Sequence, residues 1–273
     1  MRKFYPLLAT RAIKITVSVI LAGLSWFVDA TQPDGQRTLA PFHATYVAYK
    51  WGDDVGKAEI TLEPLSDQSF SLKYSSDVSK FFLSDKRSEH SLFHLEGGQL
   101  IPDEYHYKRS GTGKDSRLSV YFDGSNDVIQ IENSPSIPWS GEKDNQLYRL
   151  DLSRQLAAGK KEVTYEFINY RGELRTYLIK VVGEEQLSVP YGKLNATKVK
   201  IVRKTNDRET FAWFAPSLDF HLVRLQQFKE GEEQGDIPVK KQKSKQKAIS
   251  IETSSTILDQ SKSQNIEEPL DNK

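Results

Sequence analysis

Apolar and polar residues alternate along a series of short runs that begins at residue 42, and a period of two is typical of β-strands. The first run, FHATYVAYKWG, places Phe42, Ala44, Tyr46 and Ala48 on one face and Val47, Tyr49 and Trp51 on the other. Further runs are GKAEITLEPL, FSLKYSSD, RLSVYFDG, DVIQIEN, VTYEFINY, LRTYLIKVVG and ATKVKIVRK. Short polar turns such as LSDQS separate the first runs, so the pattern predicts an antiparallel sheet.

One segment, residues 144–160, has a different period. In DNQLYRLDLSRQLAAGK, apolar residues recur at near-helical spacing, Asp144 can cap the start, and Gly159 can end the helix. Many strands with a single helix, and no alternation of strands with helices, indicate a mainly β fold. We therefore expect an antiparallel curved sheet or half-barrel with one helix, followed by a disordered C-terminal tail.

The first 30 residues have the pattern of a secretory signal peptide. A basic opening precedes an apolar run from Ile15 to Phe27, which is shorter than the roughly 20 residues needed to span a bilayer. Val28 and Ala30 fit the positions that signal peptidase recognises, so we expect cleavage after Ala30. An uncleaved N-terminal anchor is the alternative. No cysteine follows the run to carry a lipid, and in a Gram-negative bacterium the mature protein would be periplasmic.

The chain after residue 235 is polar, and it lowers the apolar share of the whole protein to 37%. In KKQKSKQK and the residues beyond it, Lys, Gln, Ser and Glu dominate without a sustained period, which is the composition of a disordered segment. We therefore divide the chain into a signal peptide at 1–30, a linker at 31–40, a β-rich domain at 41–235 and a disordered polar tail at 236–273. A solvated tail is the simplest interpretation of its lysines.

Charge and composition exclude several functions. The net charge is +1, and the first 30 residues carry four basic side chains against Asp29, which leaves −2 for the remainder and no field that would gather nucleic acid. The chain has no cysteine, so thiol catalysis and cysteine metal sites are excluded. His90 and His94 would stand roughly 13 Å apart on a strand, too far to share a metal. We expect no metal and no cofactor.

Other short motifs predict turns and surface features. SGTGKDS, residues 110–116, lacks the spacing of a phosphate loop and predicts a hairpin turn. No Gly-x-Ser-x-Gly motif is present, and the carboxylate pairs lie in turn-like contexts. The sequence therefore gives no positive support for enzymatic activity.

Aromatic residues make up 11% of the chain, and they can either fill the core of a curved sheet or line a cavity for an acyl chain. They are densest in TFAWFAPSLDFHLVRLQQF, residues 210–228, where Pro216 predicts a bend between two strands. If a cavity exists, we expect Tyr46, Tyr105, Trp213 and Phe220 to line its wall.

Five stretches occur in order between Phe42 and Phe228: FHATYVAYKWGDDVGKAEITL, RSEHSLFHLEGGQLIPDEYHYKR, LYRLDLSRQLAAGK, VVGEEQLSVPYGKLNATKVK and TFAWFAPSLDFHLVRLQQF. Together they resemble the exported bacterial family called domain of unknown function 3108. The resemblance implies an exported, mainly antiparallel β-domain with no established activity and no accepted catalytic residues. One departure is the final strand, for which only Ile237 to Val239 offers a weak candidate. The architecture also resembles that of periplasmic lipoprotein carriers, whose half-barrels hold acyl chains.

Three functional hypotheses follow. The first is a non-enzymatic periplasmic binding module for a lipid-like or hydrophobic ligand. The second is a structural or interaction protein of envelope assembly, which would contact an envelope protein through exposed sheet edges or the Lys-rich tail. The third is a hydrolase of envelope glycans with Glu89, Asp103 or Glu104 as acid and base, and it rests only on carboxylates near aromatic residues.

Overall fold

The computed structural model describes residues 39–203 and 207–244, which form a sheet of 15 strands with one α-helix and a short 3₁₀-helix. Neighbouring strands pair antiparallel, except that β9 and β10 are parallel. The predicted mainly β fold with one helix is therefore confirmed. Neither described helix has the length and apolar character of a membrane-spanning helix.

The first nine strands are β1 (Phe42–Lys50), β2 (Asp53–Pro64), β3 (Ser69–Lys80), β4 (Leu83–Glu96), β5 (Gln99–Gly111), β6 (Ser116–Asp123), β7 (Val128–Ile131), β8 (Ile137–Pro138) and β9 (Lys143–Asp144). They precede the helix α1 (Leu147–Ala157). The remaining elements are β10 (Glu162–Ile168), β11 (Leu174–Val189), β12 (Gly192–Val202), β13 (Arg208–Ala215), the 3₁₀-helix η1 (Pro216–Leu218), β14 (His221–Lys229) and β15 (Glu232–Ser244).

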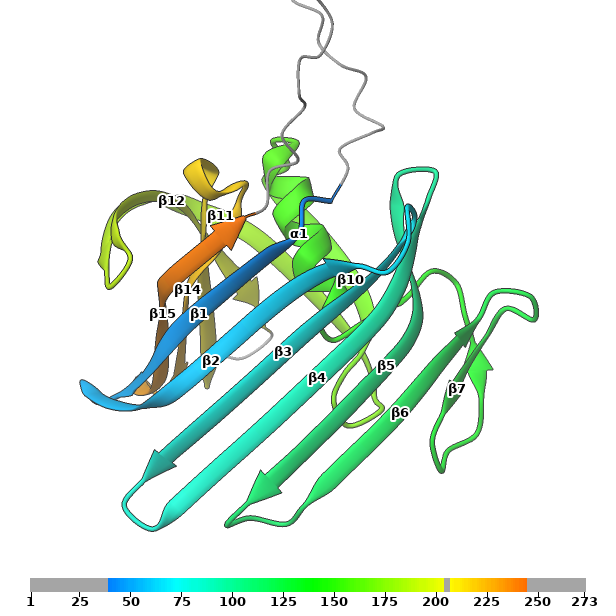
Figure 1. The fold of residues 1–273 in the computed structure, drawn as a ribbon, viewed down its shortest axis with the longest axis horizontal. Coiled ribbons are helices and arrows are strands. Elements are labelled where there is room, and N and C mark those ends of the chain that lie inside the picture. The colour runs from blue at the N-terminus through cyan, green and yellow to red at the C-terminus, as the bar shows by residue number, and fades with distance from the viewer. Residues whose placement is uncertain (1–38, 204–206, 245–273) are drawn as a thin grey trace, which may run out of the picture. The chain divides into compact units, whose positions relative to one another are not determined.

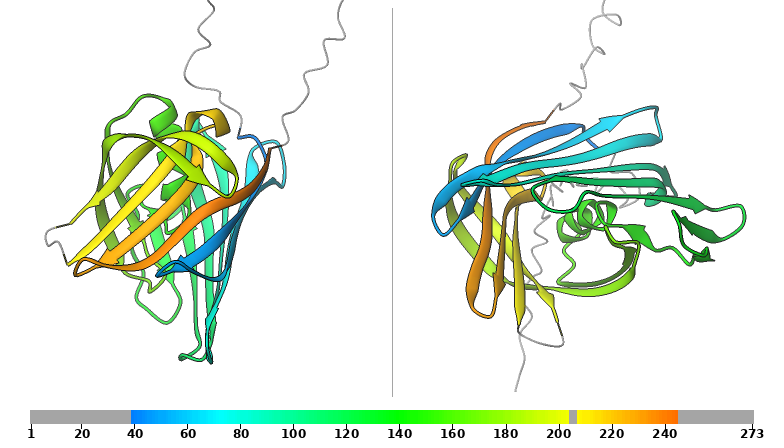
Figure 2. Two further views of the ribbon diagram at one scale, coloured as in Figure 1. Left: turned by 90° about the vertical axis from the view of Figure 1, so that its left-hand side faces the viewer. Right: turned by 90° about the horizontal axis from the view of Figure 1, so that it is seen from below.

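The sheet has two arms that meet where β1 pairs with β15. One arm runs outward from β1 through β2 to β8, and the other runs from β15 through β14 to β9. The second arm curls round, so that α1 lies on the concave side between the two arms (Figures 1 and 2). Bulges in the β11–β12 and β13–β14 pairs add local bend and twist to this arm. The predicted curved sheet is therefore confirmed.

The antiparallel order gathers the chain reversals at two opposite ends of the sheet. One end carries the turns β1–β2, β3–β4, β5–β6, β10–β11, β12–β13 and β14–β15, and we call it the β1–β2 end. The opposite end carries the starts of β1 and β14 together with η1. Side chains near the first and last residues of each strand can therefore be assigned to one end or the other.

Two local predictions are confirmed. β13 ends at Ala215, Pro216 begins η1, and β14 begins at His221, which is the predicted strand, bend and strand of residues 210–228. The predicted hairpin turn of residues 110–116 joins β5 to β6, and Arg109 pairs with Ser116 across it.

The predicted domain boundary at residue 235 is wrong, because residues 236–244 belong to β15. This strand pairs with β1 on one side and with β14 on the other. Its sequence, EEQGDIPVKKQKS, has few apolar residues, and Pro238 interrupts the alternation close to a bulge in the β1–β15 pair. The strand is paired through its backbone on both sides and buries Val239 in the core, and its composition reveals neither feature. The predicted signal peptide (1–30) and the rest of the predicted tail lie outside the described residues.

We predict that a chain ending at Ser244 unfolds like the full chain, whereas a chain ending at Gly235 does not form the fold. Loss of residues 236–244 removes most of β15, so β1 and β14 lose their common partner and become unpaired edges. Thermal unfolding followed by circular dichroism measures both variants. A chain ending at Gly235 that kept the sheet signal and the midpoint of the full chain would contradict the assignment of β15.

Candidate functional site

A cavity of about 750 Å³ lies on the concave side of the sheet, between α1 and strands of both arms. Its volume is within the range of roughly 300–1,000 Å³ that is common for small-molecule sites. Side chains alternate between the two faces of each strand, so every second residue of β2, β11 and β13 can point inward. Its apolar lining includes Ile60, Leu72, Leu150, Leu152, Ile179, Val199, Ile201, Phe214, Leu222, Leu225 and Ile237.

The cavity wall is basic near the β1–β2 end of the sheet. Six of the lining residues are arginines, and two are carboxylates: Arg87, Arg149, Arg171, Arg175, Arg203 and Arg208, with Glu89 and Glu173. Four of the arginines lie in or beside the turns β10–β11 and β12–β13, which belong to this end. Salt bridges to Asp85 and Glu173 neutralise Arg87 and Arg175. The remaining arginines give this end a cationic character.

The opposite end of the cavity is apolar. Phe42 and His221, which begin β1 and β14, stack with ring centroids 3.9 Å apart. Burial lowers the pKa of His221 to about 4, so its imidazole is neutral at neutral pH. The cavity therefore runs from an uncharged aromatic end to a cationic end, which is the polarity of an amphiphilic ligand.

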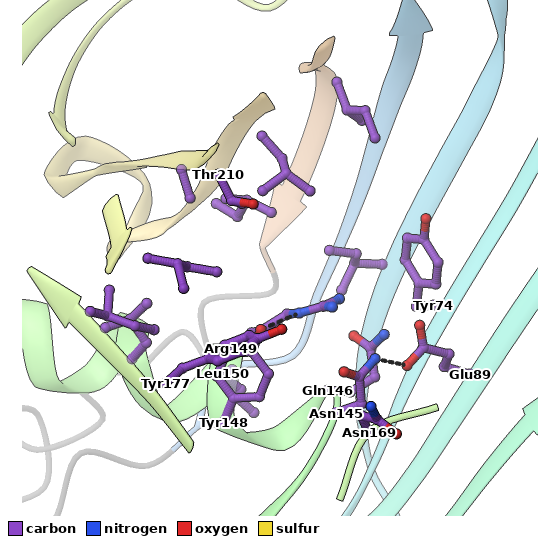
Figure 3. A pocket seen from close by; sticks show the side chains of 18 of the residues that line it. Tyr74, Glu89, Asn145, Gln146, Tyr148, Arg149, Leu150, Asn169, Tyr177 and Thr210 are labelled. Carbon is purple, nitrogen blue, oxygen red and sulfur yellow. Dashed lines mark hydrogen bonds between the residues drawn. The ribbon is translucent and has the colours of Figure 1, made fainter. Parts of the chain in front are cut away.

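Arg149 is the arginine that α1 contributes to the cavity. Figure 3 shows its side chain reaching from the helix into the cavity, with Tyr74 and Glu89 on the facing strands. Its Nε donates to the Tyr148 hydroxyl at 3.3 Å, and among the described residues it forms no salt bridge with a carboxylate. Burial opposes its charge, but Tyr148 and Glu89 raise the pKa of the guanidinium, which stays protonated. A guanidinium that makes no salt bridge keeps N–H donors that can bind the anionic group of a ligand.

Glu89 is the carboxylate on the wall that faces Arg149. Its Oε2 accepts a hydrogen bond from Asn145 Nδ2 at 2.7 Å (Figure 3) and another from the Tyr105 hydroxyl at 2.7 Å. The side chain is 6% exposed, and both of its partners are buried, so its position is fixed. These bonds connect β4 to β5 and to the segment just before α1.

Asp144 holds the start of α1 against β4. Its Oδ1 accepts hydrogen bonds from the Ser91 hydroxyl and from the backbone N–H groups of Gln146 and Leu147, at 2.7 to 2.8 Å. The predicted cap at Asp144 is displaced, because the N-cap residue of α1 is Gln146, two residues later, and its side chain makes no cap hydrogen bond. Its Oδ2 is buried without a partner among the described residues. Burial raises the pKa of Asp144 to about 6, although the hydrogen bonds oppose this effect.

The four residues expected to line a cavity do not gather at one place. Tyr46 lines it, and its hydroxyl donates to the Leu222 carbonyl at 2.9 Å. Tyr105, Trp213 and Phe220 are outside its lining. Tyr105 is fully buried and reaches the cavity only through Glu89.

Trp213 and Phe220 lie outside the cavity for different reasons. Thr210, Ala212 and Phe214 line it, so the intervening Trp213 points to the other face of β13. There its indole N–H donates to Glu185 at 2.9 Å. Phe220 sits in the reversal after η1 with a φ of +55°, and its carbonyl accepts a hydrogen bond from Ser153 of α1.

The cavity residues that sequence reasoning missed are the arginines. A signal for them exists in the alternation: Arg175, Tyr177 and Ile179 share the inner face of β11, and Arg208, Thr210 and Ala212 share that of β13. On both strands the arginine comes first, at the β1–β2 end, and less polar residues follow toward the opposite end.

The carboxylates considered for glycan hydrolysis are not brought together. Glu89 points into the cavity, whereas Asp103 and Glu104 form pairs with His94 and His106 at 2.8 and 2.9 Å. His90 and His94 both lie on β4, as predicted. Within residues 39–203 and 207–244, no three His, Cys, Asp or Glu side chains are arranged to hold a metal ion.

The comparisons with known proteins identify a family and a fold. The model of the protein family of unknown function DUF3108 matches residues 42–233. A β-barrel-like protein of the domain of unknown function DUF1849 from Brucella abortus has 8% identity and a TM-score of 0.50, over 76% of this chain and 98% of that chain. A protein with a YmcC-like fold from Bacteroides fragilis has 14% identity and a TM-score of 0.30, over 76% and 97%. No curated protein matches the chain. The likeness to the Brucella protein concerns the fold.

We predict that Asp144→Asn changes the pH dependence of stability. The folded pKa of Asp144, about 6, lies above its ordinary value of 3.8, so its contribution to stability is present below pH 3.8 and is lost as the pH rises to about 6. Asn keeps the acceptor for the Gln146 and Leu147 N–H groups but does not ionise. The free energy of unfolding of the wild type relative to the variant should therefore fall by as much as about 3 kcal/mol between pH 4 and pH 7.

Chemical denaturation at both pH values measures this difference. Asp67→Asn, in an exposed turn, is the control, and its effect should be nearly the same at the two pH values. An equal effect of Asp144→Asn at pH 4 and pH 7 would contradict a raised pKa for Asp144.

Proposed function

The chain belongs to the DUF3108 family of proteins of unknown function, and from its cavity we propose that it is a non-enzymatic binding module for a lipid-like ligand. The observation that carries the proposal is the polarity of the cavity, which is apolar and aromatic at one end and lined by arginines at the other. A ligand that matches it has an acyl-like apolar part and an anionic group. The family and fold neighbours indicate no enzymatic class.

The apolar part of the ligand would lie along the inner faces of β2, β11, β12 and β13. Ile60, Ile179 and Val199 present aliphatic surface there. Removal of apolar area from water contributes about 25 cal/mol per Å², so a chain of several methylene groups binds such a wall without directional contacts. This accounts for affinity but gives little selectivity among apolar ligands.

The anionic group would contact Arg149. The guanidinium offers planar, bidentate recognition of a carboxylate or phosphate. Among the described residues Arg149 forms no salt bridge, and its one side-chain hydrogen bond goes to the Tyr148 hydroxyl, so further N–H donors of the guanidinium could bind the ligand. The wall carboxylates Glu89 and Glu173 would disfavour ligands that bring an anion beside them.

Export is part of the same proposal. The pattern of residues 1–30 supports a signal peptide cut after Ala30 and a periplasmic mature protein that starts at Thr31. The intact mass of the protein recovered from a periplasmic fraction measures this. A protein that kept its first 30 residues would contradict the cleavage and favour the N-terminal anchor.

We predict that Ile60→Trp prevents ligand binding by filling the cavity. The larger ring occupies volume on the inner face of β2, so the affinity for a fluorescent fatty acid should fall by about tenfold or more. Native mass spectrometry of the purified wild type should show a bound lipid-like molecule, and that of the variant should not. Lys57→Trp, on the same strand but exposed, is the control and should bind like the wild type.

Arg149→Met tests the anionic end in the same assay. The substitution keeps an apolar stem of similar length and removes the charge, so binding of a fatty acid should weaken more than binding of its methyl ester. A wild type that emerges empty and takes up neither probe would overturn the proposed function. Equal loss for both probes would leave the cavity proposal standing and remove Arg149 as the anion-binding group.

The hypothesis of an interaction protein in envelope assembly stays a prediction. Its Lys-rich tail is now limited to residues after Ser244, because residues 236–244 belong to the sheet.

A further inference from the structure

Two neighbouring turns at the β1–β2 end expose large apolar side chains. The β3–β4 turn carries Phe81, which is 92% exposed, and Phe82, which is 87% exposed, followed by the half-exposed Leu83. The β1–β2 turn carries Trp51, which is 62% exposed. Single exposed apolar residues are ordinary, but here four lie on two turns at the same end of the sheet, and the Lys80 ammonium lies 4.7 Å from the Trp51 ring centroid and 5.9 Å from that of Phe81. We call these four residues the aromatic tip.

The backbone of both turns disfavours the residues that occupy them. Each hairpin has a two-residue loop, and the first loop residue has a positive φ: +56° for Trp51 and +57° for Phe81. Gly or Asn is usual at such positions because a side chain with Cβ is strained there. Rings exposed to this degree make few packing contacts and so contribute little to the stability of the fold. Their placement is therefore unexplained by folding and points to a contact outside the chain.

Lys80 joins the two turns, and both Lys50 and Lys80 lie beside the Trp51 ring. The Lys80 ammonium lies 3.0 Å from the Asp53 carboxylate and 4.7 Å from the Trp51 ring centroid. The Lys50 ammonium also lies 4.7 Å from the Trp51 ring centroid. Aromatic rings beside lysine ammonium groups are typical of side chains at the membrane–water interface, where the ring enters the headgroup layer and the ammonium meets phosphates.

We propose that the aromatic tip inserts into the interface of a phospholipid bilayer. A bilayer suits the tip better than a protein partner, because the rings project from two convex hairpins and need a deformable apolar medium rather than one shaped pocket. Trp51, Phe81 and Phe82 would enter the region between headgroups and acyl chains, as interfacial apolar residues do. Lys50 would lie among the phosphates, whereas Lys80 is paired with Asp53.

The tip lies at the same end of the sheet as the arginines of the cavity. Arg87 follows Leu83 by four residues on β4 and lines the cavity. Docking would therefore turn the cationic end of the cavity toward the membrane, from which a lipid-like ligand could enter. This consequence rests on the proposed function, but insertion of the tip does not.

Vesicle flotation of the mature protein, which starts at Thr31 and lacks the apolar run of residues 15–27, tests the insertion. The vesicles contain either phosphatidylethanolamine with phosphatidylglycerol or phosphatidylcholine. The variant Phe81→Gly with Phe82→Ser should bind at least about tenfold more weakly, since it removes the interfacial rings. It should be as stable as the wild type or more stable, because Gly relieves the positive φ at position 81. Tyr191→Ser, an exposed aromatic in the β11–β12 turn at the opposite end, is the control and should keep full binding.

Each result has a separate meaning. Failure of the wild type to float with either kind of vesicle, or equal flotation of the tip variant, would overturn the insertion and favour a protein partner for the tip. Binding of the wild type that is lost in the tip variant supports it. Ile60→Trp should float normally, and the tip variant should still take up a soluble fluorescent fatty acid. Loss of uptake in Ile60→Trp alone therefore reports on the cavity and not on the tip.

Discussion

The concave shape of the protein depends on a set of buried hydrogen bonds around Asp144. Strands β8 and β9 are the two edges of the sheet, so no backbone ladder closes the curl. Side chains close it instead: Asp144 accepts from Ser91, Asn145 donates to Glu89, and the Lys143 ammonium donates to the Leu100 carbonyl at 2.8 Å. These bonds join the segment before α1 to β4 and β5, and they hold the helix on the concave side. Because the groups are buried, loss of one partner would leave an unsatisfied polar atom, which is costly.

The hydrogen bonds that fix the helix also explain why the space beside it is not filled by side chains. A half-barrel of this size could fill its interior with apolar side chains. Polar bonds hold α1 and the segment before it to both arms, through Ser91 and Glu89 on one side and through Tyr165 and the Phe220 carbonyl on the other. The cavity lies beside the helix between these contacts. Arg149 projects into that space, where desolvation of its charge is unfavourable. A sequence selected only for stability would place an aliphatic residue at this position of α1. Departures from local stability of this kind tend to mark functional sites.

Much of the fold was predictable because a period of two is a local property of the chain. The runs around Phe42 and Thr197 became β1 and β12, and Pro216 interrupted the sheet as expected. Strand β15 was indicated only by the weak candidate Ile237 to Val239, since its partners β1 and β14 are chosen by tertiary pairing and its own residues are mostly polar. The same limit applied to the cavity. Alternation assigns Trp213 and Phe214 to opposite faces, but only the curl of the second arm decides which face is the inner one.

The arginines show what a sequence argument would need in addition. On β11 and β13 an arginine precedes inward-facing residues of lower polarity, and on the oppositely directed β12 the order is reversed, with Val199 and Ile201 before Arg203. Successive strands of an antiparallel sheet run in opposite directions. The order of arginine and apolar residues must therefore reverse from one strand to the next if all the arginines are to lie at one end. An inward face that changes from polar to apolar in alternating direction therefore predicts a polarised cavity rather than a uniform core. The turns β1–β2 and β3–β4, which carry the aromatic tip, lie at this same end because antiparallel pairing places alternate turns at the two ends of the sheet.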